Sequence, residues 1–414
     1  MATLRCIHET DELLRLAPAW EALLAQTKAP SFFLSWEWIS AWQQVYRQKH
    51  RLCVIVAEEG GAPVGIAPFM IGGGLDSLAP RGQQLTRPIR FLKFLGQGEC
   101  YPEQLDFLLP PGRAEELAPA FAKYALTTLS RQWDVLFLQN VQPEAAVAQA
   151  MEAWLLQVGL KAEHAETLSG PFAALPASKE EYWKGRSANF RSQYKNSANR
   201  LAKRGEVRLE IVTEESELEP AFAELVRLNS LRWGEENQSF HSEPYLQFHR
   251  QLMKRLLPRG ELLLALLRVD GRVAAAKYDF VYGGKAWNYQ GGWDPEFARE
   301  RVGLVLLGRI VEHCIERGLA EYDFLGGTDA GYKDRFATGS RTTVDLLAPT
   351  RSLRGHAFRL ARESSHLIQE QGLPEKARAI GARMRRITER LTGRAEPAPS
   401  DDSSSTDRRD DREP

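Results

Sequence analysis

The sequence predicts an α/β protein with two domains, each a mixed sheet flanked by helices, followed by C-terminal helices and a disordered tail. Three observations lead to this prediction. The 414 residues exceed the usual size of one compact domain. Hydrophobic residues make up 43% and charged residues 26%, which is typical of globular proteins. Amphipathic helical segments alternate with short apolar strand segments, and a similar order of segments occurs twice along the chain.

The first predicted domain covers residues 1–170 and begins with two helices. Asp11–Gln26 shows helical spacing of apolar residues, and Ser35 is a suitable N-cap for a second helix that reaches Tyr46. A hairpin, two further strands and two helices complete the domain. These elements are predicted at Leu52–Ala57, Pro63–Met70, Leu105–Leu109, Ala114–Ser130, Val135–Leu138 and Ala145–Val158.

The second predicted domain covers residues 171–350, and its boundary lies near Ser169–Ser178, where Pro171 and Pro176 interrupt the pattern. Its predicted helices are Glu217–Trp233, Tyr245–Leu256, Arg299–Arg317 and Tyr332–Phe336. Its predicted strands are Leu262–Val269, Val273–Val281, Lys285–Gln290, Tyr322–Leu325 and Thr342–Leu347. Asp270-Gly271 is a typical hairpin turn between two of these strands.

The end of the chain differs in composition from both domains. Residues 351–394 are predicted to form basic amphipathic helices, interrupted near Gly372 and Pro374. Residues 395–414 are rich in Pro, Ser, Asp and Arg and contain almost no apolar side chain. Because this segment cannot bury enough surface to offset its loss of conformational entropy, we expect it to be disordered.

Charge and cysteine content narrow the class of function. The 54 basic and 54 acidic residues balance, so no global field favours nucleic acid or membrane, and no nucleic-acid partner is expected. The four cysteines show neither metal-ligand nor redox-motif spacing, so no metal is expected. The start of the chain lacks an apolar signal core, and no apolar run reaches the roughly 18 residues that span a bilayer. We therefore expect a cytoplasmic protein; its oligomeric state stays open.

Two segments of the second domain carry polar residues where α/β proteins form sites. In the first, a strand ends in Asn288–Pro295 and a helix begins after Arg299. The free backbone amides at such a helix start attract anions, and a cofactor pyrophosphate is the expected ligand. The alternative is a tight connection in which the glycines serve chain geometry alone.

In the second segment, the strand Tyr322–Leu325 leads into two glycines and a short helix. Tyr332 is a suitable proton donor, and Lys333 could hold a phosphate or a developing negative charge. The alternative is an ordinary turn at Thr328-Asp329 followed by an exposed lysine.

These motifs resemble the C-terminal half of the CelD/BcsL-type acetyltransferases, which are GNAT-fold proteins related to the FemABX peptidyltransferases. The residues that carry the resemblance are Arg301–Gly303, Tyr322–Gly327 and Tyr332–Lys333. The resemblance covers roughly Tyr182–Leu347, and the first half by architecture only. It implies tandem GNAT-like (acyl-CoA N-acyltransferase) domains with the substrate site in the second. The loop Glu300–Val305 departs from the usual Gln/Arg-x-x-Gly-x-Gly/Ala pattern of GNAT enzymes.

The resemblance further implies an acyltransferase that uses acetyl-CoA or another acyl-CoA. The acceptor would be an amine or hydroxyl of a polysaccharide or cell-envelope precursor, linked to a lipid or nucleotide or present as a small molecule. Two strands, Lys285–Gln290 and Tyr322–Leu325, would splay apart to admit the pantetheine arm. Tyr332 would protonate the departing thiolate, and Lys333 would assist it. The implied cofactor-binding residues are Tyr289, Gln290, Gly291, Arg301, Val302 and Gly303, with a backbone N–H of the first three polarising the thioester carbonyl.

A general base for the acceptor is expected on a neighbouring strand. Lys277 and Asp279 alternate onto one strand face, so we expect Asp279 to reach the substrate, with Lys277 beside it. Asp294 and His241 are alternatives, and a simple ion pair between Lys277 and Asp279 is a further one. Relatives often carry a substrate-facing loop here, so Trp233 and His241 are expected to face the substrate; the alternative is ordinary aromatic packing.

A basic stretch opens the second domain. Arg191 and Lys195 lie one helical turn apart, and no acidic residue interrupts the segment 184–204. This segment could bind the phosphates of CoA, of a lipid- or nucleotide-linked sugar, or of tRNA. The alternative is a solvated helix face.

Two other functions remain as rivals. A FemABX-like transferase would use aminoacyl-tRNA, although the coiled-coil insertion frequent in that group is not seen between Glu210 and Leu347. A non-catalytic GNAT-fold adaptor would bind a partner through the basic C-terminal helices.

Overall fold

The structure is a computed structural model that describes residues 2–27, 30–73, 89–234, 238–326 and 330–370. The chain divides into two compact units, residues 1–356 and residues 357–414. The predicted tail and the predicted helical residues beyond Glu370 lie outside the described residues, as do Thr328 and Asp329.

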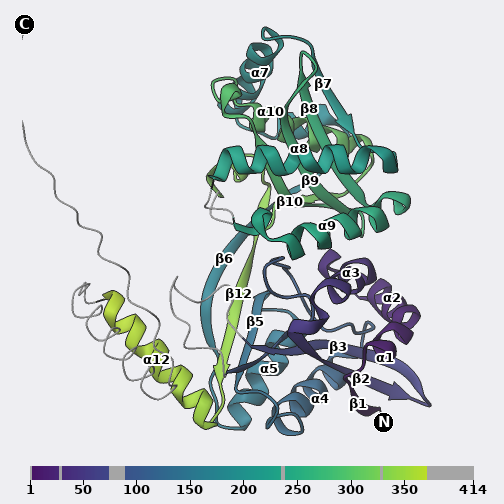
Figure 1. Cartoon of the computed structure of the whole chain (residues 1–414), viewed down its shortest axis with the longest axis vertical. Coiled ribbons are helices and arrows are strands. Elements are labelled where there is room, and N and C mark those ends of the chain that lie inside the picture. Colours follow the sequence, from purple (N-terminus) through teal and green to yellow (C-terminus); the bar gives the residue numbers. More distant parts are fainter. Residues whose placement is uncertain (1, 28–29, 74–88, 235–237, 327–329, 371–414) are drawn as a thin grey trace, which may run out of the picture. The chain divides into compact units, whose positions relative to one another are not determined.

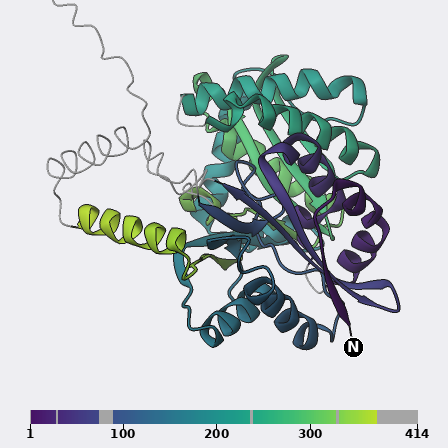
Figure 2. The ribbon, with the colours of Figure 1, turned by 60° about the horizontal axis from the view of Figure 1, so that its bottom comes forward.

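Within the described residues, twelve strands of the first unit form one mixed sheet (Figures 1 and 2). The strand order is β1-β2-β3-β4-β5-β12-β6-β11-β10-β9-β8-β7. The predicted α/β class with a mixed sheet and flanking helices is confirmed.

The strands and helices up to residue 174 form one half of this sheet. The strands are β1 (Thr3–Ile7), β2 (His50–Glu59), β3 (Ala62–Gly73), β4 (Arg90–Phe94), β5 (Val135–Val141) and β6 (Glu163–Ala174). The helices are α1 (Thr10–Arg15), α2 (Ala17–Gln26), α3 (Trp36–Tyr46), α4 (Ala114–Thr127) and α5 (Ala146–Gln157), with 3₁₀ turns at Phe32–Leu34 and Arg47–Lys49.

The strands and helices after residue 174 make up the second half of the chain. The strands are β7 (Val207–Ile211), β8 (Leu262–Val269), β9 (Arg272–Tyr282), β10 (Lys285–Trp293), β11 (Glu321–Asp323) and β12 (Gly339–Pro349). The helices are α6 (Lys179–Lys184), α7 (Ala188–Ala202), α8 (Glu215–Trp233), α9 (Glu243–Leu256), α10 (Val302–Glu316), α11 (Ala330–Lys333) and α12 (Leu353–Glu370). The 3₁₀ turns are Gln238–His241, Leu257–Arg259 and Pro295–Phe297.

The two halves repeat one strand pattern, as the order of predicted segments suggested. Strands β1 to β4 pair antiparallel in sequence, and β4 pairs parallel with β5. Strands β7 to β10 pair antiparallel in the same way, and β10 pairs parallel with β11. The last strand, β12, lies between β5 and β6, so it joins the two halves. The domain boundary near residue 170 stays a prediction.

Both faces of the second half are covered, which explains why β8 is a continuous apolar run. Leu262, Leu264 and Leu266 face a core formed with α8 and α9, and this core continues into the first half. The alternate residues Leu263 and Leu267 face a second core formed with α7 and α10. A strand with two covered faces needs apolar side chains throughout.

Several sequence predictions need correction. The single helix predicted at Asp11–Gln26 is interrupted at Leu16, because Pro18 fits only the first turn of a new helix. Leu105–Leu109 is not a strand; Leu108 forms only an isolated bridge with Ile66. Gln104 just before it has a positive φ of 57°, which bends the chain out of extended geometry. The strands β1, β4, β6 and β7 were not predicted.

Candidate functional site

The central feature of the site is the divergence of two neighbouring strands. Strand β10 pairs with β11 only from Lys285 to Trp287, although β10 itself continues to Trp293. Beyond this point β11 has ended, and Leu325 adopts a positive φ of 54°, which turns the chain away. The second half of β10 therefore keeps β9 on one edge and parts from β11 on the other, as expected for these strands.

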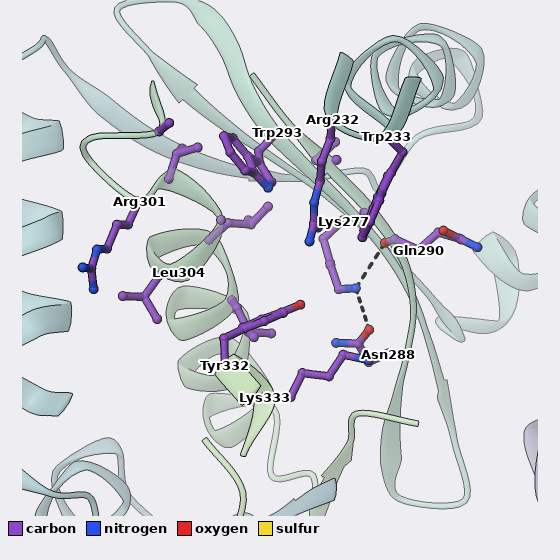
Figure 3. A pocket seen from close by; sticks show the side chains of 18 of the residues that line it. Arg232, Trp233, Lys277, Asn288, Gln290, Trp293, Arg301, Leu304, Tyr332 and Lys333 are labelled. Carbon is purple, nitrogen blue, oxygen red and sulfur yellow. Dashed lines mark hydrogen bonds between the residues drawn. The ribbon is translucent and has the colours of Figure 1, made fainter. Parts of the chain in front are cut away.

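A pocket of about 580 Å³ opens at this divergence (Figure 3). Its size is in the range of small-molecule sites. Strand β10, the start of α10, the end of α8 and the segment around α11 all contribute to its wall. The lining residues are Gln193, Arg232, Trp233, Ala276, Lys277, Asn288, Tyr289, Gln290, Gly291, Gly292, Trp293, Ala298, Arg301, Val302, Gly303, Leu304, Leu306, Leu307, Tyr332, Lys333 and Arg335.

Two glycines allow the helices to approach this pocket. A Cβ on Gly292 would lie 2.3 Å from the backbone nitrogen of Asn229, so glycine is required where α8 crosses β10. A Cβ on Gly308 of α10 would lie 2.3 Å from the ring of Tyr194. Because glycine has no side chain, the end of α8 and one side of α7 can come close enough to line the pocket.

The pocket wall is strongly cationic. Five of its side chains carry or can carry a positive charge: Arg232, Lys277, Arg301, Lys333 and Arg335. Among the described residues that line it, none carries a carboxylate. A pocket of low dielectric constant whose charged side chains all have the same sign attracts ligands of the opposite charge. This pocket therefore suits an anionic ligand.

The start of α10 adds to the attraction for anions. Arg301 precedes the helix with a left-handed backbone, φ 54° and ψ 50°, which a residue other than glycine rarely adopts. The residues that follow, Val302 and Gly303, line the pocket with the first turn of the helix. Since the N–H groups of a first turn have no partner within the helix, the helix start favours a negative group here.

The aromatic side of the pocket comes from α8 and β10. The guanidinium of Arg232 lies 4.3 Å from the ring centre of Trp233 and 5.9 Å from that of Trp293. The two indole rings and the guanidinium of Arg232 present planar surfaces, which suit a planar or apolar group of a ligand. Across the pocket, Lys333 is held near β11 because its Nζ donates a hydrogen bond to the carbonyl oxygen of Phe324 at 3.0 Å.

A buried polar network lies under this pocket. Lys277 Nζ donates hydrogen bonds to Asn288 Oδ1 at 2.7 Å and to the carbonyl oxygen of Gln290 at 3.2 Å, and it lies 3.3 Å from Asp279 Oδ1. Burial lowers the pKa of Lys277, and burial raises the pKa of Asp279. The three N–H bonds of the ammonium match three acceptors, so Lys277 is held as a donor.

Asp279 is occupied by several donors. Its side chain is 0% exposed and accepts hydrogen bonds from the Tyr322 hydroxyl at 2.5 Å and from the Tyr289 backbone N–H at 3.1 Å. It does not line the pocket. The expectation that Asp279 reaches the substrate is therefore wrong. Strand alternation predicts the face of the sheet on which a side chain lies, but it does not predict whether other residues bury that side chain. The alternative, an ion pair between Asp279 and Lys277, is present.

Most of the predicted site residues come together in the pocket. These are Trp233, Lys277, Tyr289, Gln290, Gly291, Arg301, Val302, Gly303, Tyr332 and Lys333. Arg191 and Lys195 lie on the exposed face of α7, and His241 is exposed in a 3₁₀ turn; none of the three lines the pocket. Asp294 is buried and paired with Arg272, and its side chain caps the turn at Glu296.

Several lining residues were not predicted from the sequence. Arg232, Gln193 and Arg335 come from α8, α7 and the segment after α11, which no local motif connects to the strand turn. Asn288 belonged to a motif that was recognised, but its role depends on Lys277 eleven residues earlier. The alternation of β9 and β10 could have indicated this pair, because cross-strand neighbours share a face.

The described residues contain no group of three or more His, Cys, Asp or Glu side chains arranged to hold a metal ion. They also include no helix with the length and apolar character that crossing a membrane requires.

Residues 188–334 match the model of a protein family described as the acetyltransferase (GNAT) domain. This stretch runs from α7 to α11 and includes all of the pocket-lining residues except Arg335. No curated protein matches the sequence.

Solved structures resemble the chain over most of its length. A crystal structure of FemX is 11% identical with a TM-score of 0.56, and the match covers 86% of this chain and 99% of that chain. A conserved protein of unknown function from Bacteroides thetaiotaomicron VPI-5482 is 11% identical with a TM-score of 0.48, covering 84% and 100%. The DUF2156 domain of a putative lysylphosphatidylglycerol synthetase from Agrobacterium fabrum is 12% identical with a TM-score of 0.47, covering 84% and 96%.

At these identities the likeness to FemX concerns the fold. Together with the domain match and the repeated strand pattern, it shows a tandem GNAT-type fold with a GNAT acetyltransferase domain in the second half. The CelD/BcsL resemblance stays a prediction.

Proposed function

We propose that the chain transfers an acyl group, expected to be acetyl, from acyl-CoA to an amine or hydroxyl of a polysaccharide or cell-envelope precursor. One observation supports this function above the others. A cationic pocket, lined by no carboxylate of the described residues, opens where β10 parts from β11 and reaches the first turn of α10. Such a pocket suits a long ligand with phosphates at one end and a carbonyl at the other.

The chemistry of the pocket wall fits acyl-CoA. Arg301 and the first turn of α10 would hold the phosphates, as the charge and the free helix amides favour. Leu304, Leu306 and Leu307 offer an apolar wall for the pantetheine arm. Of the three backbone donors expected on β10, Gln290 and Gly291 stay proposed, because the N–H of Tyr289 is given to Asp279.

Tyr332 is the proposed proton donor. It lines the pocket from α11, and its hydroxyl points toward Lys277 and Asn288 (Figure 3). Transfer leaves a thiolate, and a phenol at this place can protonate it. Lys333 would stabilise negative charge on the same side, as its position near the end of β11 allows.

No basic side chain for the acceptor is assigned. Neither a carboxylate nor a histidine of the described residues lines the pocket, and Asp279 is enclosed. We propose that the acceptor gives its proton to water. Trp233 and His241, near the end of α8, and the exposed Arg191 and Lys195 are proposed to contact the acceptor and its phosphate or diphosphate.

A ligand and acceptor screen tests this function. Calorimetric titration with acetyl-CoA, longer acyl-CoAs and aminoacyl-tRNA should show saturable binding of an acyl-CoA. Thiol release from the bound thioester should then depend on an added amino sugar or sugar hydroxyl. Binding of aminoacyl-tRNA without acyl-CoA would favour the FemABX-like transferase instead, and binding of neither would favour the adaptor.

A further inference from the structure

The side chain of Asn288 stands out in the buried network. It is 4% exposed and lies on β10 directly after Trp287, the last residue that pairs with β11. Its Nδ2 has no hydrogen-bond acceptor among the described residues. Buried amide groups nearly always have partners, so a buried donor without one indicates an acceptor supplied by a ligand.

The orientation of this amide is fixed by Lys277. An ammonium can only donate hydrogen bonds, so the oxygen of Asn288 must face Nζ at 2.7 Å. The amide nitrogen then faces away from Lys277, into the pocket on the side of Tyr332 (Figure 3). Asp279 and the carbonyl oxygen of Gln290 contact Lys277 in turn, so the orientation is set by a connected polar network.

The backbone N–H next to Asn288 is not available to a ligand in the pocket. Tyr289 follows at a bulge of β10, and its N–H points to Asp279 rather than into the pocket. The side chain of Asn288 therefore presents N–H groups at the place where the strand itself does not.

We propose that Asn288 is a catalytic residue whose Nδ2 donates a hydrogen bond to the acyl carbonyl oxygen, and that Lys277 is the positioning residue which holds this amide. The inference rests on the proposed function. The acceptor's nitrogen or oxygen forms a bond to the carbonyl carbon, and the C=O electron pair moves to the oxygen that Asn288 contacts. When that pair returns, the C–S bond breaks and its electrons leave with sulfur. The acceptor loses one proton to water, and Tyr332 gives one to sulfur.

Two unreactive analogues test the contact by calorimetry. In the carba analogue of acetyl-CoA a CH₂ group replaces sulfur and the carbonyl stays in place, whereas in S-ethyl-CoA a CH₂ group replaces the carbonyl. The natural chain should bind the carba analogue about tenfold more tightly than S-ethyl-CoA. Asn288→Asp keeps the shape and the partner Lys277 but places an acceptor where the donor was. It should strongly reduce this preference and lower kcat by roughly 10²-fold to 10³-fold.

Controls separate the contact from general effects. Gln157→Glu makes the same change of charge on the exposed surface of α5, outside the proposed binding residues, and should keep the preference. Asn288→Ala, which has no side-chain donor, provides a second variant in case the aspartate chain does not fold. Lys277→Met should lose most of the preference, and Lys277→Arg should restore part of it, which a merely structural lysine would not do.

The outcomes distinguish the two proposals. Equal affinity of the natural chain for the two analogues overturns the role of Asn288 and leaves acyl-CoA binding intact. An undiminished preference in Asn288→Asp or Asn288→Ala also overturns it. Binding of neither analogue contradicts the proposed function itself, and the role of Asn288 falls with it.

Discussion

The carboxylate of Glu103, from the first half of the chain, accepts a hydrogen bond from the backbone N–H of Gly326 at 2.9 Å. Gly326 follows β11 and precedes the segment that leads to α11, which carries Tyr332. Burial raises the pKa of Glu103 to about 7, the Gly326 hydrogen bond lowers it, and the charge of Asp323 raises it further. The first half of the chain thus supports the end of the strand at which the pocket opens.

Glu103 should make stability depend on pH. Because its pKa is higher in the folded chain than the usual 4.5, the stabilisation is complete below pH 4.5 and is lost as the pH rises through about 7. The loss attributable to Glu103 should be about 3 kcal/mol. Glu103→Gln keeps an acceptor for Gly326 without the charge. Its free energy of unfolding should therefore fall less between pH 4.5 and pH 8 than that of the natural chain. Urea unfolding at pH 4.5 and pH 8 measures the difference; the same pH dependence in both chains would refute it.

Gly292→Ala should destabilise the chain. The new Cβ would lie 2.3 Å from the backbone nitrogen of Asn229 and 2.4 Å from the carbonyl carbon of Leu228, so α8 must move away from β10. Such overpacking costs about 1–3 kcal/mol. Thermal unfolding measures it, with Gly331→Ala as the control, because a Cβ there meets nothing within 4 Å. Equal melting temperatures for the two variants would show that α8 does not cross β10 this closely.

Arg301 should contribute to phosphate binding. Arg301→Asn removes the charge but keeps a residue that tolerates the left-handed backbone at this position. We expect affinity for CoA to fall about tenfold at low salt and less at high salt, since screening weakens the charge interaction. Calorimetry at two ionic strengths measures this effect. Arg208→Gln, on the outer strand β7, should bind CoA like the natural chain. An unchanged affinity of Arg301→Asn would exclude Arg301 from the phosphate site.

Tyr332→Phe should lower kcat about 10²-fold with little change in the dissociation constant of acyl-CoA, because the phenol acts on the leaving thiolate rather than in binding. Steady-state kinetics with a thiol reagent, combined with calorimetry, separates the two effects. If turnover is unchanged, another group or water supplies the proton.

Much of the second half could be predicted from local patterns. The strand β8 was predicted with its observed bounds, because Leu262–Val269 is a long apolar run ended by the Asp270-Gly271 turn. The glycine-rich end of β10 and the start of α10 were recognised from their residue types, and they form two sides of the pocket.

The parts that were missed depend on residues distant in sequence. Strand β6 lies between β12 and β11, so its extended structure depends on partners about 150 or more residues later, while its own sequence contains Pro171 and Gly170. The burial of Asp279 follows from Tyr322 and from the cover of α10, which strand alternation cannot show. The role proposed for Asn288 likewise depends on its hydrogen bond with Lys277, which lies on the neighbouring strand β9.

Hydrogen exchange of the full chain with and without saturating acetyl-CoA tests the central claim most directly. If the thioester lies between β10 and β11 with its phosphates at α10, the amides of residues 288–293 and 302–305 should exchange more slowly with ligand, and those of β7 should not change. Exchange that is identical throughout the chain, or protection confined to other elements, would contradict acyl-CoA binding in this pocket.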